Sequence, residues 1–315
     1  MSGSPRDRLV LGSRASDLAR VQARRVAGLL EEAWPGLEVE IEWITTTGDR
    51  VLDKPLPEIG GKGLFTAELE AALRQGEIDA AVHSLKDLPT DLGGEFAVLG
   101  VPEREDPRDV LLGPGGSLQP EDLAEGAVVG TSSLRRKAQL LSRRPDCRVR
   151  DVRGNVETRV GKMRDGDYDA VLLAAAGLRR LDLVEAGIDL LEPPGWLPAP
   201  GQGALGVEGR ADDGATRRLL ARLEAADVRA EVTAERSLLA TLQGGCLVPI
   251  GALGRISGDE LRLDAVVLPE DGSRELRASD TAPPGEAESL GRRLAEQLLE
   301  DGADRILAEL EEREA

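Results

Sequence analysis

The chain has 315 residues, 41% of them hydrophobic, and a formal net charge of −18. This length exceeds the usual size of one hydrophobic core, so we expect two or three domains. The acidic excess argues against nucleic acid as a partner, because phosphate binding needs a basic field. The apolar runs are too short to cross a bilayer and the N-terminus lacks the apolar stretch of a signal peptide, which predicts a cytoplasmic protein that does not bind membranes.

Metal and disulfide chemistry are not expected. The chain has two cysteines, Cys147 and Cys246, and one histidine, His83. These side chains cannot build a zinc site of the usual kinds without several carboxylates, and disulfides are rare in the cytoplasm. We interpret His83 as a packed, hydrogen-bonded residue and Cys147 as a passenger at a strand edge.

The first hundred residues alternate between strand and helix patterns. Short apolar or period-two runs predict strands, and runs with apolar residues on one face predict helices. In chain order the expected elements are a strand at 8–12, a helix that Ser16 caps, a strand at 38–44, a helix at 64–75 and a strand at 80–83. This β-α-β-α-β order is typical of an α/β lobe.

The segment from about residue 104 repeats this order. Gly76–Ala80 recurs 90 residues later as Gly166–Ala170, and Val10–Ser13 has a counterpart in Val128–Thr131. These matches predict a structural duplication, hence two α/β lobes with doubly wound, mostly parallel sheets. Ligands of such sheets bind outside the carboxyl ends of the strands, so the two lobes are expected to form a cleft.

The last ninety or so residues have a different pattern. A helix over 232–242 ends at a Gly-Gly pair, and three apolar runs follow at 248–256, 261–268 and 274–278, separated by turn residues. A closing helix covers 286–310 and is expected to break near Gly302. Strands in a row flanked by helices predict a small α+β domain with an antiparallel sheet.

Cationic residues follow several of the predicted strands. Thr131, Ser133, Arg135 and Arg136 come after the strand at 127–130 and open a helix. Backbone N–H groups, hydroxyls, the helix dipole and two guanidinium groups converge there, which indicates an anion site. The alternative, an ordinary helix cap beside a solvated arginine pair, stays open at this point.

Further arginines occupy equivalent places, namely Arg14, Arg153, Arg159, Arg179 and Arg180. Because the guanidinium fork binds carboxylates in bidentate fashion, several such groups in one cleft indicate a polycarboxylate ligand. The usual phosphate loops do not fit. The glycines at 201–206 lack the strand that a dinucleotide fingerprint requires, and those at 60–63 lack the spacing of a Walker loop, so Lys62 is interpreted as a mobile cation near the cleft.

Two residues are candidates for chemistry. Asp87 ends a loop that follows the strand at 80–83; such a residue is usually a cap or a solvated charge, but its position at a strand end favours catalysis. Cys246 lies after two glycines that leave its sulfur accessible, which suggests covalent chemistry. A protease-like dyad would need a histidine base, and the single candidate is His83.

Taken together, seven motifs resemble the porphobilinogen deaminase family and span nearly the whole chain. They are Gly60–Phe65, His83–Asp87, Arg104–Asp109, Gly130–Arg136, Arg153–Asn155, Pro200–Ala204 and Gly244–Cys246. The resemblance implies two lobes like those of periplasmic binding proteins and a smaller third domain. Domain 1 would cover 1–103 and 204–221, domain 2 would cover 104–203, and domain 3 would cover 222–315 and bear the cysteine.

The resemblance also implies a chemistry, in which porphobilinogen units are joined into the linear tetrapyrrole hydroxymethylbilane, as in haem biosynthesis. Cys246 would carry a dipyrromethane cofactor through a thioether, and Asp87, with Lys86, would stabilise the cation that forms when ammonia departs. The cofactor would be held by Lys62, Ser84, Lys86, Asp87, Thr131, Ser133, Arg135, Arg136, Arg153 and Gly154. The substrate would be held by Arg14, Ser16, Arg153, Arg159 and Arg180.

Some positions depart from the family pattern at the edges of this site, namely Asp17, Arg20, Leu85, Gln243 and Leu247. Two other classes of function stay open on the residues alone. One is a non-catalytic, two-lobed carboxylate receptor, which would have no reason for an accessible Cys246. The other is a cysteine-dependent acyl or amido transferase, which would carry no added chromophore. We expect a monomer.

Overall fold

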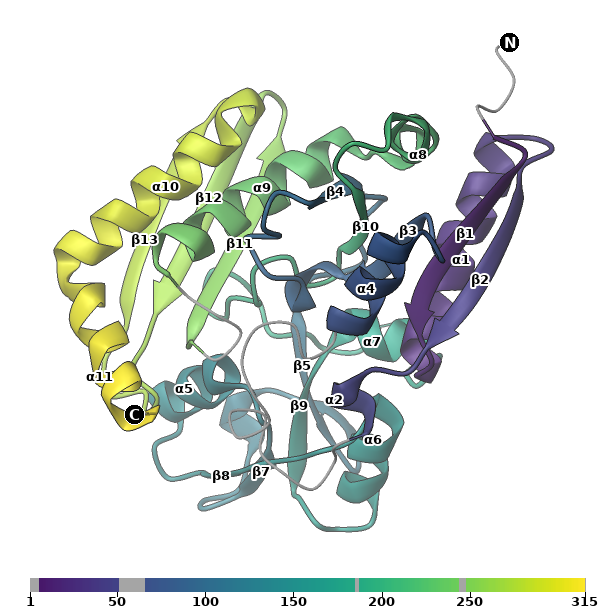
Figure 1. Ribbon diagram of the computed structural model, residues 1–315. Helices are drawn as coiled ribbons and strands as arrows, with labels where there is room; N and C mark the ends of the chain where they lie inside the picture. Colours follow the sequence, from purple (N-terminus) through teal and green to yellow (C-terminus); the bar gives the residue numbers. More distant parts are fainter. Residues whose placement is uncertain (1–5, 51–65, 185–186, 244–247, 315) are drawn as a thin grey trace. The chain divides into compact units, whose positions relative to one another are not determined.

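The computed structural model describes residues 6–50, 66–184, 187–243 and 248–314 (Figure 1). The chain divides into two compact units. The first consists of Met1–Glu105 and Ala204–Arg229, and the second of Asp106–Gly203 and Ala230–Ala315. Each unit therefore draws on two separate stretches of the sequence.

The first unit is built on a five-stranded sheet in the order β2-β1-β3-β10-β4, in which β10 alone runs against the other four strands. Helix α1 and the core residues Leu9, Val26 and Leu30 cover one face, and helix α4 with Leu69 and Leu73 covers the other. The elements are β1 (Arg8–Arg14), α1 (Asp17–Ala33), β2 (Glu38–Ile44), α2 (Thr47–Arg50), α4 (Ala67–Gln75), β3 (Ala80–Ser84), β4 (Phe96–Gly100), β10 (Leu205–Arg210) and α8 (Gly214–Leu220).

The second unit contains a sheet of the same plan, in the order β6-β5-β9-β7-β8, with β5 as the antiparallel strand. Helix α5 lies on one face and helices α6 and α7 on the other. The elements are β5 (Asp109–Gly113), β6 (Gly116–Leu118), β7 (Val128–Gly130), α5 (Leu134–Arg143), β8 (Arg148–Arg150), α6 (Val156–Arg164), β9 (Ala170–Ala174) and α7 (Ala175–Arg180).

The two sheets are repeats of each other down to their register. Leu11 of β1 pairs with Ala80 of β3, and Val129 of β7 pairs with Ala170 of β9. The turns that recur 90 residues apart in the sequence lead into β3 and β9. The predicted duplication and the predicted α/β class with mostly parallel, doubly wound sheets are therefore confirmed.

In each lobe, an aspartate side chain accepts a hydrogen bond from a backbone N–H of the central parallel strands, β1 in the first lobe and β7 in the second. Asp79 accepts a hydrogen bond from the backbone N–H of Val10 at 2.8 Å, and Asp169 accepts one from that of Val128 at 2.7 Å. Each bond satisfies the N–H at one end of a parallel strand pair. The aspartate that precedes alanine in both repeats, Asp79 and Asp169, thus has a structural role.

A third sheet, β11-β12-β13, is antiparallel and belongs to the second unit. Its helices break at Gly302, whose φ of 102° lies in the left-handed region, as predicted from the sequence. The elements are α9 (Ala226–Thr241), β11 (Ile250–Ser257), β12 (Glu260–Val267), β13 (Leu276–Ala282), α10 (Ala287–Leu298) and α11 (Asp304–Glu314). The expected antiparallel sheet flanked by helices is confirmed.

The third sheet packs directly against the second lobe. A small apolar cluster joins Ala138 of α5 and Leu197 to Leu253, Val266 and Leu268 of the sheet. A Cβ added at Gly272, where φ is +68°, would lie 2.5 Å from the backbone of α5, so the β12–β13 loop approaches that helix as closely as glycine allows. Helix α5, whose first turn belongs to the predicted anion site, is therefore in contact with the third sheet and its β12–β13 loop.

Four strands, β4, β5, β6 and β10, have no counterpart in our residue-by-residue prediction. β6 has three residues, too few for a periodicity to be recognised. β10 is a buried strand whose partners β3 and β4 lie more than a hundred residues earlier in the chain, so its pairing is entirely non-local. The predicted helix at 64–75 is described from Ala67 onward.

The close packing of the repeat gives a stability prediction. A Cβ at Gly130 would lie 2.9 Å from the ring of Tyr168, whereas a Cβ at Gly161, inside helix α6, would meet nothing within 4 Å. We expect Gly130→Ala to lower the free energy of unfolding by about 1–3 kcal/mol through overpacking. Gly161→Ala should raise it by about 0.5–1 kcal/mol through helix propensity. Urea unfolding of the two variants measures both, and an unchanged Gly130→Ala protein would contradict the packing.

Candidate functional site

In the first unit, the candidate catalytic residues follow strand β3. The strand ends at Ser84, and a single 3₁₀ turn over Leu85–Asp87 comes next. Leu85 is buried and its N–H donates to the carbonyl of Ala204 at 3.0 Å, which fixes the start of the turn. Lys86 is half-buried and Asp87 is exposed. The carboxylate of Asp87 has no hydrogen bond or ion pair with any residue that the structure describes, so it is available to a ligand.

The neighbouring strand β1 brings Arg14 and Ser16 to the same edge of the sheet. β1 runs parallel to β3, ends at Arg14, and leads through Ser16 into helix α1. Ser16 is the N-cap residue, yet its hydroxyl makes no capping hydrogen bond. Gln22 of α1 donates to the hydroxyl of Ser84 at 2.9 Å and so ties helix α1 to the end of β3. Arg14, Ser16, Ser84, Lys86 and Asp87 therefore follow adjacent strand ends of one sheet.

In the second unit, hydroxyl groups shape the turn between β7 and α5. Thr131 accepts from the N–H of Ser133 at 3.2 Å, and Ser133 caps the helix by accepting from the N–H of Arg136 at 3.5 Å. Ser132 donates to the carbonyl of Val152 at 3.0 Å and accepts from its N–H at 3.2 Å, which joins this turn to the end of β8. The hydroxyls of Thr131 and Ser133 thus both accept local backbone hydrogen bonds.

Arg153 lies in the turn that follows β8. Gly154 has a φ of +112°, and a Cβ there would lie 2.6 Å from the Thr158 side chain, so only glycine fits. Arg159 donates to the carbonyl of Gly154 at 2.8 Å, and Lys162 donates to that of Arg153 at 3.2 Å. The turn is pinned by these two cations, whereas the half-buried guanidinium of Arg153 itself has no partner among the residues described.

Arg180 stands at the end of helix α7, which continues strand β9. Its Nη2 donates to the carbonyl of Gly203 at 2.7 Å. Arg179, beside it, forms an ion pair with Asp106 at 3.2 Å. The arginines that follow β9 are therefore partly engaged by the protein itself.

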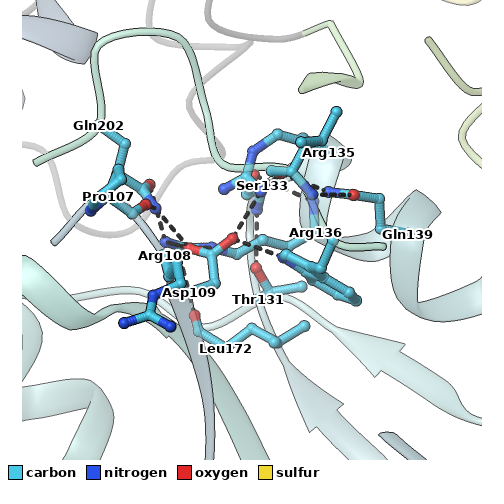
Figure 2. A network of polar contacts seen from close by, with 12 residues as sticks. Pro107, Arg108, Asp109, Thr131, Ser133, Arg135, Arg136, Gln139, Leu172 and Gln202 are labelled. Atoms are coloured by element: carbon cyan, nitrogen blue, oxygen red, sulfur yellow. Dashed lines mark hydrogen bonds and ion pairs between the residues drawn. The ribbon is translucent and has the colours of Figure 1, made fainter. Parts of the chain in front are cut away.

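A buried carboxylate, Asp109, is the centre of the polar network in this unit (Figure 2). Its Oδ2 accepts from Arg135 Nη1 at 2.6 Å and from Trp196 Nε1 at 2.8 Å. Its Oδ1 accepts from Arg136 Nη2 at 2.7 Å and Nε at 3.0 Å, and from Gln202 Nε2 at 2.8 Å. Five donors thus converge on one carboxylate whose side chain is 0% exposed.

The charges in this network do not balance. Two guanidinium groups, 4% and 7% exposed at Arg135 and Arg136, surround the single carboxylate of Asp109. The arginines hold the pKa of Asp109 far below its usual range although burial opposes this, and burial lowers the pKa of Arg135. The Nε of Arg135 is buried and has no hydrogen-bond partner among the residues that the structure describes. Within the described part of the chain, this network therefore holds one guanidinium more than it holds carboxylates, and one buried donor without an acceptor.

This arrangement refines the prediction for Arg135 and Arg136, which were both expected to face a ligand. Arg136 is turned into the protein, with bonds to Asp109, Gln202 and the carbonyl of Leu172. Sequence reasoning did not identify Asp109, Trp196 or Gln202 as parts of the site. Asp109 and Gln202 do lie inside two of the recognised motifs, Arg104–Asp109 and Pro200–Ala204, which was the available signal.

Two predicted site residues, Lys62 and Cys246, lie outside the described residues. The other cysteine, Cys147, is buried, and burial raises the pKa of its thiol, so it is a poor nucleophile. His83 is also buried and contacts Glu208 across 3.1 Å, which confirms that it is a packed, hydrogen-bonded residue.

The described part of the chain contains no cluster of three or more His, Cys, Asp or Glu side chains that could hold a metal ion. Nor does it contain a helix with the length and apolar character needed to span a membrane.

Comparisons with known proteins point to one family. The family model described as "Porphobilinogen deaminase, dipyromethane cofactor binding domain" matches residues 9–218, and that of the "Porphobilinogen deaminase, C-terminal domain" matches residues 229–300. The porphobilinogen deaminase of Roseiflexus castenholzii is 50% identical over 96% of this chain and 99% of its own length. That of Geobacter sulfurreducens is 48% identical over 98% of this chain and 96% of its own length.

Two solved structures of lower sequence identity also resemble the chain. The methionine binding protein MetQ is 11% identical, with a TM-score of 0.44 over 72% of this chain and 93% of its own. The periplasmic VFT2 domain of Bordetella pertussis BvgS is 16% identical, with a TM-score of 0.43 over 69% of this chain and 86% of its own. The two family models together cover most of the chain, and relatives with half of their residues identical match it over nearly its full length. The chain belongs to the porphobilinogen deaminase family.

Proposed function

We propose that this chain joins four porphobilinogen molecules head to tail into hydroxymethylbilane, on a dipyrromethane primer attached to Cys246 through a thioether. Family membership supports the reaction. The observation that carries the assignment of the site is the unmatched charge around Asp109, with the unpartnered Nε of Arg135. Each porphobilinogen unit bears an acetate and a propionate, so a primer made from it supplies the carboxylates that such a donor requires.

The cationic and hydroxyl residues at the strand ends are proposed to hold these carboxylates. In the second unit, the unpaired guanidinium of Arg153 and the open edge of Arg135 are the strongest candidates, with Thr131, Ser133, Gly154, Arg159 and Arg180 around them. In the first unit, Arg14 and Ser16 serve the incoming substrate, and Lys62, Ser84 and Lys86 serve the primer. An arginine without an internal partner retains its full electrostatic attraction for an anion, which is why Arg153 stands out.

Asp87 is proposed as the catalytic carboxylate. When ammonia leaves porphobilinogen, the C–N bond breaks and a cation remains on the substrate; a carboxylate without an internal ion pair is free to stabilise it. The bound primer supplies the pyrrole carbon that forms the new C–C bond, and the displaced pyrrole proton is then released. Lys86, the preceding residue in the same turn, is proposed to assist the departing amine and to bind a carboxylate.

We also propose the domain division and setting of the protein. Domain 1 would comprise 1–103 and 204–221, domain 2 would comprise 104–203, and domain 3 would comprise 222–315. The first lobe's use of two separate stretches of chain supports this division. We propose a cytoplasmic monomer that needs no metal, in keeping with a substrate and primer that carry the reactive groups themselves.

The attachment site can be tested by intact mass. Cys246→Ser should fold but carry no covalent dipyrromethane, because a hydroxyl is a far poorer nucleophile than a thiol at neutral pH. Cys147→Ser, the matched control at the buried thiol, should keep the added mass and the activity. Full primer mass on Cys246→Ser would refute the attachment.

The role of Asp87 can be tested by steady-state kinetics on Asp87→Asn. This change keeps the size of the side chain but removes its charge, so turnover should fall by about a hundredfold or more while KM changes much less. The variant should first be loaded with primer from preformed hydroxymethylbilane and its mass checked, because primer assembly from porphobilinogen involves the same loss of ammonia. Asp91→Asn, an exposed aspartate in the following loop, is the matched control. Near-normal turnover of loaded Asp87→Asn would remove Asp87 from the mechanism.

The carboxylate-binding role of Arg153 is tested by Arg153→Leu. Because this guanidinium has no internal partner, its removal should leave the melting temperature nearly unchanged while KM for porphobilinogen or the rate of primer loading worsens by about tenfold or more. Arg148→Leu, an exposed arginine of strand β8, removes the same charge as a control. An Arg153→Leu enzyme with the substrate response of the control would count against this turn as part of the site.

A further inference from the structure

The two arginines around Asp109 are bound in unequal ways. Arg136 uses all three of its nitrogen atoms within the protein: Nε and Nη2 contact Asp109, Nη2 also lies 3.4 Å from Gln202 Oε1, and Nη1 donates to the carbonyl of Leu172 at 3.1 Å. Arg135 uses only Nη1, which donates to Asp109 at 2.6 Å and to the carbonyl of Leu197 at 2.7 Å. The unequal pairing leaves one edge of Arg135 without a partner in the described part of the chain.

That edge has the shape of a carboxylate site. Nε and Nη2 of an arginine point their hydrogens in nearly the same direction, so together they bind one carboxylate in bidentate fashion. Nε of Arg135 is buried without a partner among the described residues, and the hydrogen bonds that this guanidinium makes with them both come from Nη1. A buried donor of this kind raises the free energy of the protein until an acceptor reaches it.

We infer that Asp109 is the positioning residue of this site: it engages Arg136 fully and Arg135 on one edge only, so that a single guanidinium fork is presented to one ligand carboxylate. The inference rests on the proposed function, because it takes the ligand to be the primer or the growing chain. It assigns different roles to two neighbouring arginines, with Arg135 as the ligand-binding member and Arg136 as part of the support.

The support extends beyond Asp109. Trp196 and Gln202, which both donate to Asp109, belong to the segment between α7 and β10. Gln139 fixes this segment by accepting from the N–H of Leu197 at 2.8 Å and donating to its carbonyl at 2.9 Å. The segment also meets Glu235 of helix α9.

Glu235 joins this segment to the third sheet. Its buried carboxylate accepts from the N–H of Gly201 at 2.6 Å and from that of Gly254, in β11, at 2.8 Å. Gly201 immediately precedes Gln202. The orientation of Arg135 therefore depends on a chain of bonds that begins in helix α9, which ends at Thr241, five residues before Cys246.

A purely structural role for Asp109 makes different predictions from a positioning role. If the cluster only stabilises the fold, then loss of either arginine should reduce stability, and binding should fall only as far as folded protein is lost. If Asp109 positions Arg135, then substitutions of the two arginines should have different effects. Substitution of Arg135 should mainly impair ligand binding, and substitution of Arg136 should mainly lower stability.

The test compares four variants of the full chain, with primer loading from preformed hydroxymethylbilane followed by intact mass. Arg135→Lys keeps a cation near Asp109 but loses the fork, so loading should slow by about tenfold or more with a melting temperature within about 2 °C of the unsubstituted protein. Arg136→Lys should lower the melting temperature by about 4 °C or more and slow loading of the folded protein less than Arg135→Lys does. Asp109→Asn should slow loading by at least about tenfold.

The fourth variant is a rescue. Asp109→Asn combined with Gln202→Glu places a carboxylate beside Arg136 again, from a side chain that already lies 3.4 Å from it, and should recover part of the loading rate. Asp146→Asn, which removes a surface partner of Arg144 in the same lobe, is the control and should load within about twofold of the unsubstituted chain.

The outcomes separate this inference from the proposed function. If the unsubstituted chain takes up no primer mass, then the proposed function fails. If it loads normally but Arg135→Lys and Arg136→Lys slow loading equally, or Arg136→Lys slows it more, then the positioning inference is wrong while the function stands. Loading of folded Asp109→Asn within about twofold of the control would overturn the inference as well. If Asp109→Asn fails to fold, then the loading rates of Arg135→Lys and Arg136→Lys decide whether the positioning inference holds.

Discussion

A carboxylate that is removed from water must be matched by donors and positive charge, and Asp109 meets this requirement with more charge than it needs. Its five donors come from helix α5 and from the segment that leads to β10. Removing one member of a buried ion pair leaves an uncompensated charge, at a penalty of about 3–5 kcal/mol, so the members of this network constrain one another. The guanidinium of Arg135 is therefore held in place while its Nε lacks an acceptor among the described residues, which is the arrangement that the proposed carboxylate site requires.

The duplicated fold explains how the remaining groups reach their positions. Parallel strands end at the same edge of a sheet, so the turns after β1 and β3 in one lobe, and after β7, β8 and β9 in the other, each carry polar residues to such an edge. The two lobes share this strand arrangement but carry different side chains at the strand ends. Among the described residues, Asp87 of the first lobe has no hydrogen-bond or ion-pair partner, whereas several arginines of the second lobe are held by carbonyls and carboxylates of that lobe. A carboxylate of this kind suits a reaction in which a cation forms, and arginines suit a polycarboxylate ligand, in keeping with the function proposed for the chain.

Much of this could be predicted from the sequence, and the exceptions have physical reasons. Local patterns locate β2 at 38–44, the break at Gly302 and the repeat of the strand turns, because these depend on neighbouring residues. Strand β10 pairs with partners far away in the chain, which periodicity does not report. The different roles of Arg135 and Arg136 depend on Asp109, Trp196 and Gln202, which lie 26 to 67 residues away from them in sequence. The sequence alone therefore does not distinguish the roles of two adjacent arginines, because their partners are distant in the chain.

The open edge of Arg135 can be observed directly in solution. In ¹⁵N-edited NMR spectra of the primer-free and primer-loaded protein, the arginine Nε–H signals of Arg135 and Arg136 can be assigned by their loss in the corresponding lysine variants. The account predicts that the Arg136 Nε–H exchanges slowly with solvent in both states, while that of Arg135 shifts and becomes protected only when the primer is bound. An Arg135 signal that is unchanged by loading, or an Arg136 signal that changes as much, would contradict the account.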